Sequence, residues 1–436
     1  MQQIQTQKGY KKEKFLFGFQ QIPESWTIKK LIELCNEKPQ YGAAVSALPK
    51  NTDLPRYIRI TDLNDDGSLK ANEWKSISEK VSKPYLLAED EILFARTGAT
   101  VGKTYLYNKK HGKCAFAGYL IRFKPEKNKL IPEYLFHYTH SSYYWKWLRS
   151  IQTEGVQPNV NAEQYSNMLL LCPPLQEQQK IASILSTVDE LIQKTEQIIE
   201  QTQRLKKGLM QRLLTKGLGH TKFRKTELGE IPKQWNIVEI DEITSKITDI
   251  DHKMPKKVEQ GIPFITVKYL TRDDSYYFNL NHDADLEYIL EEDFEHHSKK
   301  FNAEYGDLLF SRYGTIGVTK MINTKEKLIA SYSIALIKPK REIIFPLFLT
   351  HVLNSDKIKR QIQSFIEQSS NTNLDLLRIK KIKIPKPNLR EQQKISSIIS
   401  YIDLLVQKRR ELKIKYENLK KGLMQQLLTG KIRVKV

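Results

Sequence analysis

Apolar residues recur every three or four positions along two long segments of the chain, residues 176–215 and 390–429. No proline interrupts either segment, so each is predicted to form one long helix. At 1.5 Å per residue such a helix is about 60 Å long, more than one ordinary domain can cover. The narrow apolar stripe with its seven-residue repeat predicts that each helix packs along a partner helix. The stripe comprises Ile181, Ile184, Val188, Leu191, Ile198, Leu205 and Leu209 in the first segment, and Ile395, Ile398, Ile402, Leu405, Leu412, Leu419 and Leu423 in the second.

The two segments are copies of each other. At an offset of 214 residues they align without a gap and share 22 of 40 positions, including the run LKKGLMQ. The expected partner of each helix is therefore the other copy. An antiparallel pair carries the chain away in the first helix and back in the second, so we expect the C-terminus to return near the N-terminus.

The rest of the chain is also repeated. Residues 22–26 (IPESW) return as 231–235 (IPKQW), and residues 57–63 (YIRITDL) match 264–270 (FITVKYL), both with the alternation of a β-strand. Residues 91–104 (EILFARTGATVGKT) match 307–319 (DLLFSRYGTIGVT) when one residue is gapped. A turn rich in Gln or Asn, at residues 155–160 and 369–374, closes each copy before its long helix.

This order predicts a mixed α/β (α+β) protein with two similar domains. A pair of long antiparallel coiled-coil helices separates the domains, which are related by a pseudo-two-fold axis. We expect a basic, loosely ordered arm at residues 1–20, a first domain at 21–175, a long helix at 176–217, a Gly- and charge-rich linker at 218–230, a second domain at 231–389 and a final long helix at 390–436.

The composition adds an expected partner. The chain has 71 Lys and Arg against 50 Asp and Glu, a formal net charge of +21. Such a charge is typical of proteins with a polyanionic partner, usually nucleic acid. The alternative is a basic surface that serves solubility alone.

Cysteine usage and hydropathy predict a cytoplasmic protein. Cys35, Cys114 and Cys172 are far apart and odd in number, so they indicate neither a disulfide framework nor a zinc site. The apolar runs are much shorter than a membrane span, and the N-terminal residues lack the apolar core of a signal peptide.

Residues 96–104 (RTGATVGKT) resemble a phosphate-binding P-loop, but the spacing is wrong. Gly98 and Gly102 are separated by three residues instead of four, and Val318 replaces the lysine in the second copy. Nucleotide binding is therefore disfavoured. Both copies share Arg-x-Gly after an apolar strand, which predicts a tight turn that presents Arg96 and Arg312.

Enzymatic activity in the chain itself is a second hypothesis. Asp66 with residues 73–75 (EWK) loosely resembles a nuclease metal site, but the second copy has no counterpart. Residues 172–175 (CPPL) lack the Asn or Asp of a methyltransferase loop, and the nine histidines are scattered. The sequence therefore predicts no catalytic constellation and no metal site. A nuclease or methyltransferase with its own active site, and a coiled-coil scaffold that does not bind DNA, stay as alternatives.

Basic and hydrogen-bonding residues interleaved with aromatic residues occur in both domains. Arg and Lys bond phosphates and guanine edges, whereas Thr and Tyr adapt to either, so this chemistry suits duplex DNA. The candidate DNA-binding residues are Arg56, Arg59, Thr61, Lys70, Lys75, Arg96 and Lys103 in the first domain, and Lys268, Tyr269, Arg272, Arg312, Tyr313 and Thr315 in the second.

Three motifs together resemble the specificity subunit of type I restriction-modification systems. They are the two long helices that end in LKKGLMQxLLT, the preceding PLQEQ and NLREQ at residues 174–178 and 388–392, and the LFxRxG turns. The resemblance covers nearly the whole chain from about residue 20. It implies a non-catalytic DNA-recognition subunit with two target-recognition domains, each of which reads one half of a bipartite, asymmetric sequence. The helix pair would set the spacer between the half-sites.

The resemblance also implies partners. These are double-stranded DNA, two methyltransferase (modification) subunits and two ATP-dependent restriction subunits. The resemblance implies that S-adenosylmethionine, ATP and Mg²⁺ bind to these partner subunits and that this chain has no cofactor. Residues expected to face outward from the helix starts are the candidate methyltransferase contacts: Gln178, Gln179, Lys180, Gln392, Gln393 and Lys394.

Overall fold

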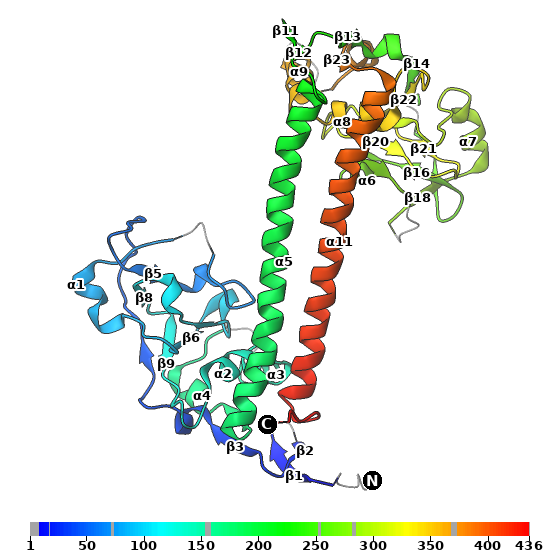
Figure 1. The fold of residues 1–436 in the computed structure, drawn as a ribbon. Helices are drawn as coiled ribbons and strands as arrows, with labels where there is room; N and C mark the ends of the chain where they lie inside the picture. The colour runs from blue at the N-terminus through cyan, green and yellow to red at the C-terminus, as the bar shows by residue number, and fades with distance from the viewer. Residues whose placement is uncertain are drawn as a thin grey trace. The chain divides into compact units, whose positions relative to one another are not determined.

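The computed structural model describes residues 8–16, 18–70, 74–152, 158–251, 254–280, 285–367 and 373–435. The chain divides into two compact units. Unit 1 consists of residues 1–196 and 411–436, and unit 2 consists of residues 197–410. Both boundaries fall within long helices, so each unit contains part of both helices together with an α/β body (Figure 1).

The two predicted long helices are confirmed. Helix α5 spans Leu175–Lys216 and helix α11 spans Leu389–Leu427. In unit 1 Lys420 pairs with Asp189 (2.5 Å) and Lys413 with Glu196 (2.9 Å). A later residue of α11 therefore pairs with an earlier residue of α5. In unit 2 Lys206 pairs with Asp403, and Leu213 near the end of α5 lies in one core with Ile395 near the start of α11. The helices are therefore antiparallel within each unit. Neither they nor any other helix in the described residues has the length and apolar character of a membrane span.

The apolar stripe is buried only where each helix meets an α/β body. Ile181 and Ile395, near the two helix starts, are both 0% exposed. Leu205 and Leu419, farther along, are 63% and 49% exposed, so the paired helices leave part of the stripe uncovered. Two helices have fewer contacts for a side chain than a body with a sheet, so the stripe loses its cover away from the bodies.

The main sheet of unit 1 has the strand order β4–β9–β6–β7, with antiparallel pairing throughout. Strands β1 and β2 form a hairpin, β3 pairs with β10, and β5 pairs in parallel with β8. The strands are β1 (Tyr10–Phe15), β2 (Gly18–Pro23), β3 (Thr27–Lys30), β4 (Gln40–Tyr41), β5 (Arg56–Ile58), β6 (Ile92–Ala95), β7 (Thr104–Leu106), β8 (Cys114–Phe116), β9 (Leu120–Phe123) and β10 (Leu169–Cys172).

Short helices cover the sheet of unit 1 and connect it to α5. They are α1 (Glu79–Ser82), α2 (Pro132–Tyr138), α3 (Ser142–Ser150) and α4 (Ala162–Ser166), with the 3₁₀ turns η1 (Leu31–Leu34), η2 (Ile60–Asp62), η3 (Lys83–Tyr85), η4 (Gly98–Thr100) and η5 (Lys109–His111). The main core joins Trp26, Phe94 and Tyr134 to Ile181 and Leu185 of α5. The start of α5 is therefore part of the domain core.

Unit 2 repeats this plan with additional strands. Its main sheet has the order β14–β22–β19–β20–β17, and a second sheet has the order β15–β18–β16–β21. Strands β11 and β12 form a hairpin, and β13 pairs with β23. The strands are β11 (Phe223–Thr226), β12 (Gly229–Pro232), β13 (Asn236–Glu239), β14 (Thr244–Thr248), β15 (Lys257–Val258), β16 (Ile262–Ile265), β17 (Tyr277–Phe278), β18 (Glu287–Ile289), β19 (Leu308–Ser311), β20 (Thr319–Ile322), β21 (Ile329–Ala330), β22 (Ile334–Pro339) and β23 (Lys383–Lys386).

The helices of unit 2 again lead into a long helix. They are η6 (Ile240–Ile243), α6 (Val267–Leu270), α7 (Glu291–Ser298), α8 (Pro346–Leu353), α9 (Asp356–Glu367) and α10 (Leu376–Lys380). Helix α8 is buried along its whole length, and its Phe348 packs in the same core as Ile395 and Ile399 of α11.

Two local predictions are wrong because side chains and distant segments compete with the expected conformation. Residues 57–63 and 264–270 begin as strands but turn into η2 and α6 after Ile58 and Ile265. In the first, the Asp62 carboxylate accepts a hydrogen bond from the Arg59 backbone N–H (2.9 Å) and so stabilises a turn.

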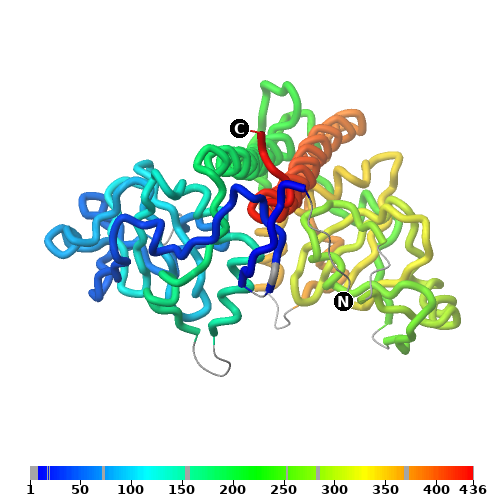
Figure 2. Tube along the Cα trace, turned by 90° about the horizontal axis from the view of Figure 1, so that it is seen from below, coloured from blue at the N-terminus to red at the C-terminus, as the bar shows by residue number. Residues whose placement is uncertain are grey.

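In the described residues, the predicted basic arm and the predicted linker each contribute to a β-hairpin. Strands β1 and β2 pair over residues 10–23, and β11 and β12 pair over residues 223–232. The Tyr10 hydroxyl donates to the Gly430 carbonyl (2.9 Å), so the hairpin of unit 1 lies beside the end of α11 (Figures 1 and 2). This contact confirms that the C-terminal segment returns to the N-terminal segment.

Candidate nucleic-acid interface

The basic residues around β5 gather at one indole ring. The Lys50 ammonium lies 4.9 Å from the centre of the Trp74 ring, and the Arg56 guanidinium lies 5.8 Å from it. Arg56 also donates to the Lys70 carbonyl (2.9 Å), while its buried Nε has no partner among the described residues. Lys70 and Lys75, which are close to Trp74 in the sequence, are half-buried. We name Lys50, Arg56, Lys70, Trp74 and Lys75 the first basic cluster, and its cations and aromatic face suit phosphate or base contacts.

Two other predicted residues of unit 1 are already paired with carboxylates. Arg59 donates to buried Asp62 through Nε (3.1 Å) and a terminal nitrogen (2.6 Å). The Lys103 ammonium lies 2.7 Å from Asp65, and this hydrogen bond lowers the pKa of the Asp65 carboxyl. Thr61 is exposed between them. The positive charge of Arg59 and Lys103 is thus largely compensated within the fold.

The Arg-x-Gly turns form in both units, but the arginine is half-buried in the first turn and buried in the second. Gly98 and Gly314 have φ of 69° and 66°, which favours glycine at both turns. Arg96 is half-buried, with its guanidinium 4.9 Å from the Tyr41 ring and its Nε 3.5 Å from Asn159 Oδ1. This side chain can reach a ligand by leaving one weak hydrogen bond.

The prediction that the second turn presents Arg312 is wrong. Arg312 is 6% exposed, and its guanidinium pairs with Asp249 and donates to the carbonyls of Leu374 and Tyr332 (both 3.1 Å). A buried carboxylate requires a counter-charge, and the Arg312 guanidinium provides it for Asp249. At this turn Thr315 is exposed and Tyr313 is half-buried.

A second basic cluster, Lys268, Tyr269 and Arg272, lies at α6 in unit 2. The Lys268 ammonium and the Arg272 guanidinium lie 5.0 and 4.4 Å from the centre of the Tyr269 ring. Tyr269 is buried and donates to the Asp285 carbonyl, while Arg272 lies 3.5 Å from the Asp285 carboxylate. Lys268 and Arg272 are exposed, so unit 2 also offers cations around an aromatic ring.

Some residues of these surfaces gave no signal in the sequence. Lys50 and Tyr41 approach Trp74 and Arg96 through folding alone, and Tyr119 is 59% exposed beside the Arg96 turn, where its carbonyl accepts the Arg96 backbone N–H (3.0 Å). No spacing rule links residue 41 to residue 96, so only the tertiary structure could identify this pair.

The prediction that Gln178 and Gln392 face outward is wrong. They are 1% and 0% exposed, and both tie the start of a long helix to the body of its own unit. Gln178 accepts from the Ile131 N–H (2.9 Å) and donates to the carbonyls of Lys129 (3.1 Å) and Pro173 (2.9 Å). Gln392 repeats these bonds with Phe345 (2.7 Å), Ile343 (3.2 Å) and Pro387 (2.9 Å). Backbone groups at helix starts need such partners when buried. Their neighbours Gln179, Lys180, Gln393 and Lys394 are exposed.

A buried glutamate precedes each of these glutamines. Glu177 accepts from Trp26 Nε1 (3.0 Å) and pairs with Arg433 through both oxygens (2.8 Å each). Glu391 accepts from Trp235 Nε1 (3.0 Å) and from the Leu218 N–H (2.9 Å). Its Oε1 also lies 2.8 Å from His220 Nε2. The repeated tryptophans therefore have a shared structural role, which the sequence did not predict.

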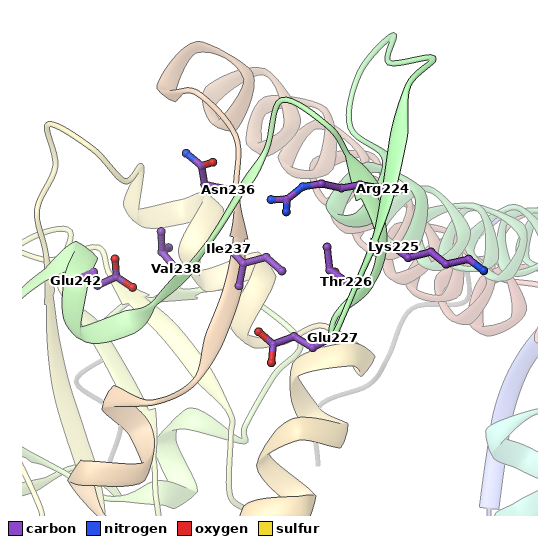
Figure 3. Close-up of a pocket in the computed structure, with 8 residues that line it drawn as sticks. All are labelled: Arg224, Lys225, Thr226, Glu227, Asn236, Ile237, Val238 and Glu242. Atoms are coloured by element: carbon purple, nitrogen blue, oxygen red, sulfur yellow. The ribbon is translucent and has the colours of Figure 1, made fainter.

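One surface hollow of unit 2 is lined by none of the predicted residues and by no residue of the second basic cluster. It measures about 610 Å³ and lies between the β11–β12 hairpin and β13 (Figure 3). Arg224, Lys225, Thr226 and Asn236 line it, and Arg224 donates to the Trp235 carbonyl (2.9 Å). We assign it no role.

The structure provides no support for a metal-dependent enzyme. In the described ranges, no group of three or more His, Cys, Asp and Glu side chains could hold a metal ion. Glu73 of the nuclease hypothesis lies outside those ranges, as do residues 155–157 and 369–372 of the two predicted turns.

Comparison with known families decides between the hypotheses. Residues 23–204 and 232–416 each match the type I restriction modification DNA specificity domain. The chain belongs to this family. Specificity subunits recognise the DNA target and are non-catalytic, which confirms the recognition role and excludes the enzyme hypothesis.

Relatives and solved structures agree with this assignment. The MjaX and MjaVIII specificity subunits of Methanocaldococcus jannaschii are 30% and 27% identical to the chain, over 98% of the chain in each case and 98% and 97% of the relatives. The crystal structure of the type I restriction-modification system S subunit from M. genitalium matches with a TM-score of 0.56 at 14% identity, covering 92% of this chain and 96% of that one. A chain solved in work on assembly and conformational transition of the type I system matches with a TM-score of 0.54 at 15% identity, covering 94% and 99%. These structures support the specificity-subunit fold.

Proposed function

We propose that each unit of this specificity subunit reads one half of a bipartite, asymmetric DNA sequence. The observation that carries this proposal is the duplication: two bodies with matching sheets and matching helix attachments each display a cluster of cations around an aromatic ring. The clusters differ in sequence and in structure, Lys50, Arg56 and Trp74 in one and Lys268, Tyr269 and Arg272 in the other. Different side chains on a shared scaffold would read different bases.

The helix pair would set the number of unread base pairs between the half-sites. Two readers on one side of a duplex are well placed when the centres of their sites lie about one helical turn, roughly 34 Å, apart. A stiff helix pair can hold such a separation, whereas a flexible linker cannot.

The same helices would dock the modification subunits. Large apolar side chains are exposed on both: Leu191, Ile198 and Leu205 on α5, and Tyr401, Leu404, Leu405, Ile414 and Leu419 on α11. Exposed apolar residues concentrated on one element favour a protein interface. We propose that two methyltransferase subunits bind there and at Gln179, Lys180, Gln393 and Lys394, and that two restriction subunits join this complex in the cytoplasm. S-adenosylmethionine, ATP and Mg²⁺ would be bound by those subunits.

Single-molecule sequencing of adenine methylation tests the proposal. Cells would express the chain with its cognate methyltransferase, and the genome would be read for modified adenines. We expect one bipartite motif with a constant gap. Substituting Lys268 and Arg272 with alanine should relax one half of the motif and leave the other half unchanged. Relaxation of both halves, or a continuous motif without a gap, contradicts the division of labour.

A further inference from the structure

Unit 1 contains an acidic pocket that DNA recognition does not explain. It measures about 260 Å³ and lies between the end of β7, helix α2 and the first half of α5. Five carboxylates line it, from Glu89, Asp90, Glu133, Asp189 and Glu190. In a chain with a formal net charge of +21, such a concentration of negative charge requires its own explanation.

The lysines of unit 1 compensate only part of this charge. Asp90 pairs with Lys127, Asp189 with Lys420 (2.5 Å), and Glu190 with Lys194 (3.5 Å). Glu89 accepts the Lys109 backbone N–H (3.0 Å). Neither Glu89 nor Glu133 has an ion-pair partner among the residues that the structure describes.

A buried histidine also lines the pocket with an unused nitrogen. His137 is 2% exposed, and its Nε2 lies 3.0 Å from Ser186 Oγ. Its Nδ1 has no hydrogen-bond partner in the described residues and lies 3.7 Å from Asp189 Oδ2. Burial, followed by the charge of Lys420, lowers the pKa of His137 to about 3, so the ring is neutral at pH 7. When Nε2 carries the proton toward Ser186, Nδ1 is an acceptor.

In unit 2 the side chain of Tyr276 packs against the histidine that corresponds to His137. His351 occupies the position 214 residues after His137, and the Tyr276 ring packs edge-on against it at 4.5 Å. The Lys206 ammonium lies 4.6 Å from the centre of the Tyr276 ring and pairs with Asp403, as Lys420 pairs with Asp189 in unit 1. Strand β17 follows Tyr276 and covers the outer edge of β20. The sheet of unit 1 ends at β7, with no strand equivalent to β17 paired to it in the described residues.

We propose that the acidic pocket of unit 1 binds a guanidinium or alkylammonium group. The pocket offers carboxylate oxygens beside a neutral imidazole, which suit a ligand that donates hydrogen bonds and carries positive charge. Its volume is about nine times the roughly 30 Å³ share of one water molecule, which is room for one long side-chain head and stem. The group can come from an arginine or lysine of a partner protein or from a free polyamine.

Titration of the full-length chain alone tests the chemistry, independently of DNA and of the methyltransferase. The chain would be labelled with ¹⁵N-histidine, and the probe would be propylguanidinium, with neutral propylurea of similar shape as its control. We expect a saturable shift of the His137 resonances with propylguanidinium only. His351 is the internal control, because Tyr276 already occupies its pocket. Glu133→Gln should weaken binding about tenfold, whereas Glu163→Gln, an exposed glutamate of α4 outside the pocket, should leave it unchanged.

The absence of a saturable His137 shift, or equal shifts with propylurea, overturns the proposal. An unchanged affinity in Glu133→Gln also overturns it, since the histidine spectrum of that variant shows directly whether the pocket has folded. Two further titrations identify the source of the group. If spermidine binds about tenfold more tightly than propylguanidinium and added methyltransferase leaves His137 unchanged, the ligand is a polyamine. If added methyltransferase shifts His137 and propylguanidinium reverses that shift, the ligand is a side chain of the partner.

Discussion

Residues of one type have opposite roles in this specificity subunit, depending on what lies near them. Arg59 and Arg312 neutralise the carboxylates of Asp62 and Asp249, whereas Arg56 and Arg272 lie against the rings of Trp74 and Tyr269. The distinction follows from burial, because a buried carboxylate draws the nearest cation and an exposed surface leaves its cations for a ligand. Substitutions should therefore separate folding from DNA binding residue by residue.

The two turn arginines provide such a separation. Arg312→Ala leaves Lys300, at 3.7 Å, as the one cation paired with Asp249 among the described residues, and should lower the free energy of unfolding by about 3 kcal/mol. Arg96→Ala should change it by less than about 1 kcal/mol but should weaken binding to target DNA. Urea unfolding and fluorescence anisotropy would measure the two effects. Equal stability of both variants would show that Arg312 does not have the structural role assigned to it.

The buried histidines predict how stability depends on pH. Burial lowers the pKa of His351 from 6.5 to about 3, so between these values the unfolded chain binds a proton that the folded chain does not. Stability due to this histidine is complete above pH 6.5 and decreases as pH falls toward 3, by up to about 1.4 kcal/mol per pH unit. His351→Phe should flatten the curve of unfolding free energy in that window. An unchanged slope in His351→Phe would disprove the assignment.

At the scale of elements, the long helices are held by their first turns as well as by each other. Glu177 and Gln178 of α5, and Glu391 and Gln392 of α11, bond backbone and tryptophan groups of the adjacent body. These contacts extend the domain core into the helix. The orientation of each helix start relative to its own body is therefore set by directional hydrogen bonds as well as by packing.

Replacing a glutamine at a helix start should loosen this attachment. Gln178→Ala leaves the Ile131 N–H and two carbonyls without partners in a buried place, a cost of about 3 kcal/mol. Its exposed neighbour gives a matched control, since Gln179→Ala should change stability by no more than about 0.5 kcal/mol. Hydrogen exchange of residues 129–138 is the measurement. Full protection in Gln178→Ala would mean that packing alone holds the helix start.

At the scale of the whole molecule, both ends of the chain complete unit 1. Arg433, from the segment after α11, pairs with Glu177, and Tyr10, from the first hairpin, donates to Gly430. In unit 2 the segment after α5 has the same task, with His220 and the Leu218 N–H at Glu391. The last residues are thus a structural part of the first unit.

Removing residues 430–436 should therefore destabilise unit 1 selectively. Glu177 would lose its guanidinium and, of its side-chain partners in the described residues, keep Trp26 alone, so amides of unit 1 should exchange faster. Amides of unit 2 should be unchanged, because His220 and Leu218 still bond Glu391. Hydrogen–deuterium exchange resolved by peptide measures both in one sample. Equal acceleration in both units would contradict the assignment of this segment to unit 1.

Spacer length is the second prediction at this scale. Deleting one heptad from each long helix preserves the face along which the helices pack. If the pair sets the gap, methylome sequencing should show the same half-site bases with a changed gap, or no methylation at all. Deleting a heptad from only one helix, which disrupts the pairing, is the control and should abolish modification. Altered half-site bases with an unchanged gap would refute the spacer role.

The sequence by itself determined the duplication, the two long helices, the α/β character of both bodies and the family. The predicted extension of the second helix to residue 436 is wrong, because α11 ends at Leu427. Periodicity is a local property, and a repeat is found by comparing the chain with itself. It did not determine which charged residues face solvent. Arg312 is neutralised by a residue 63 positions away, and Gln178 bonds a backbone 47 positions away. Only the tertiary structure decided these cases, since burial depends on segments that folding brings together and that no local pattern encodes.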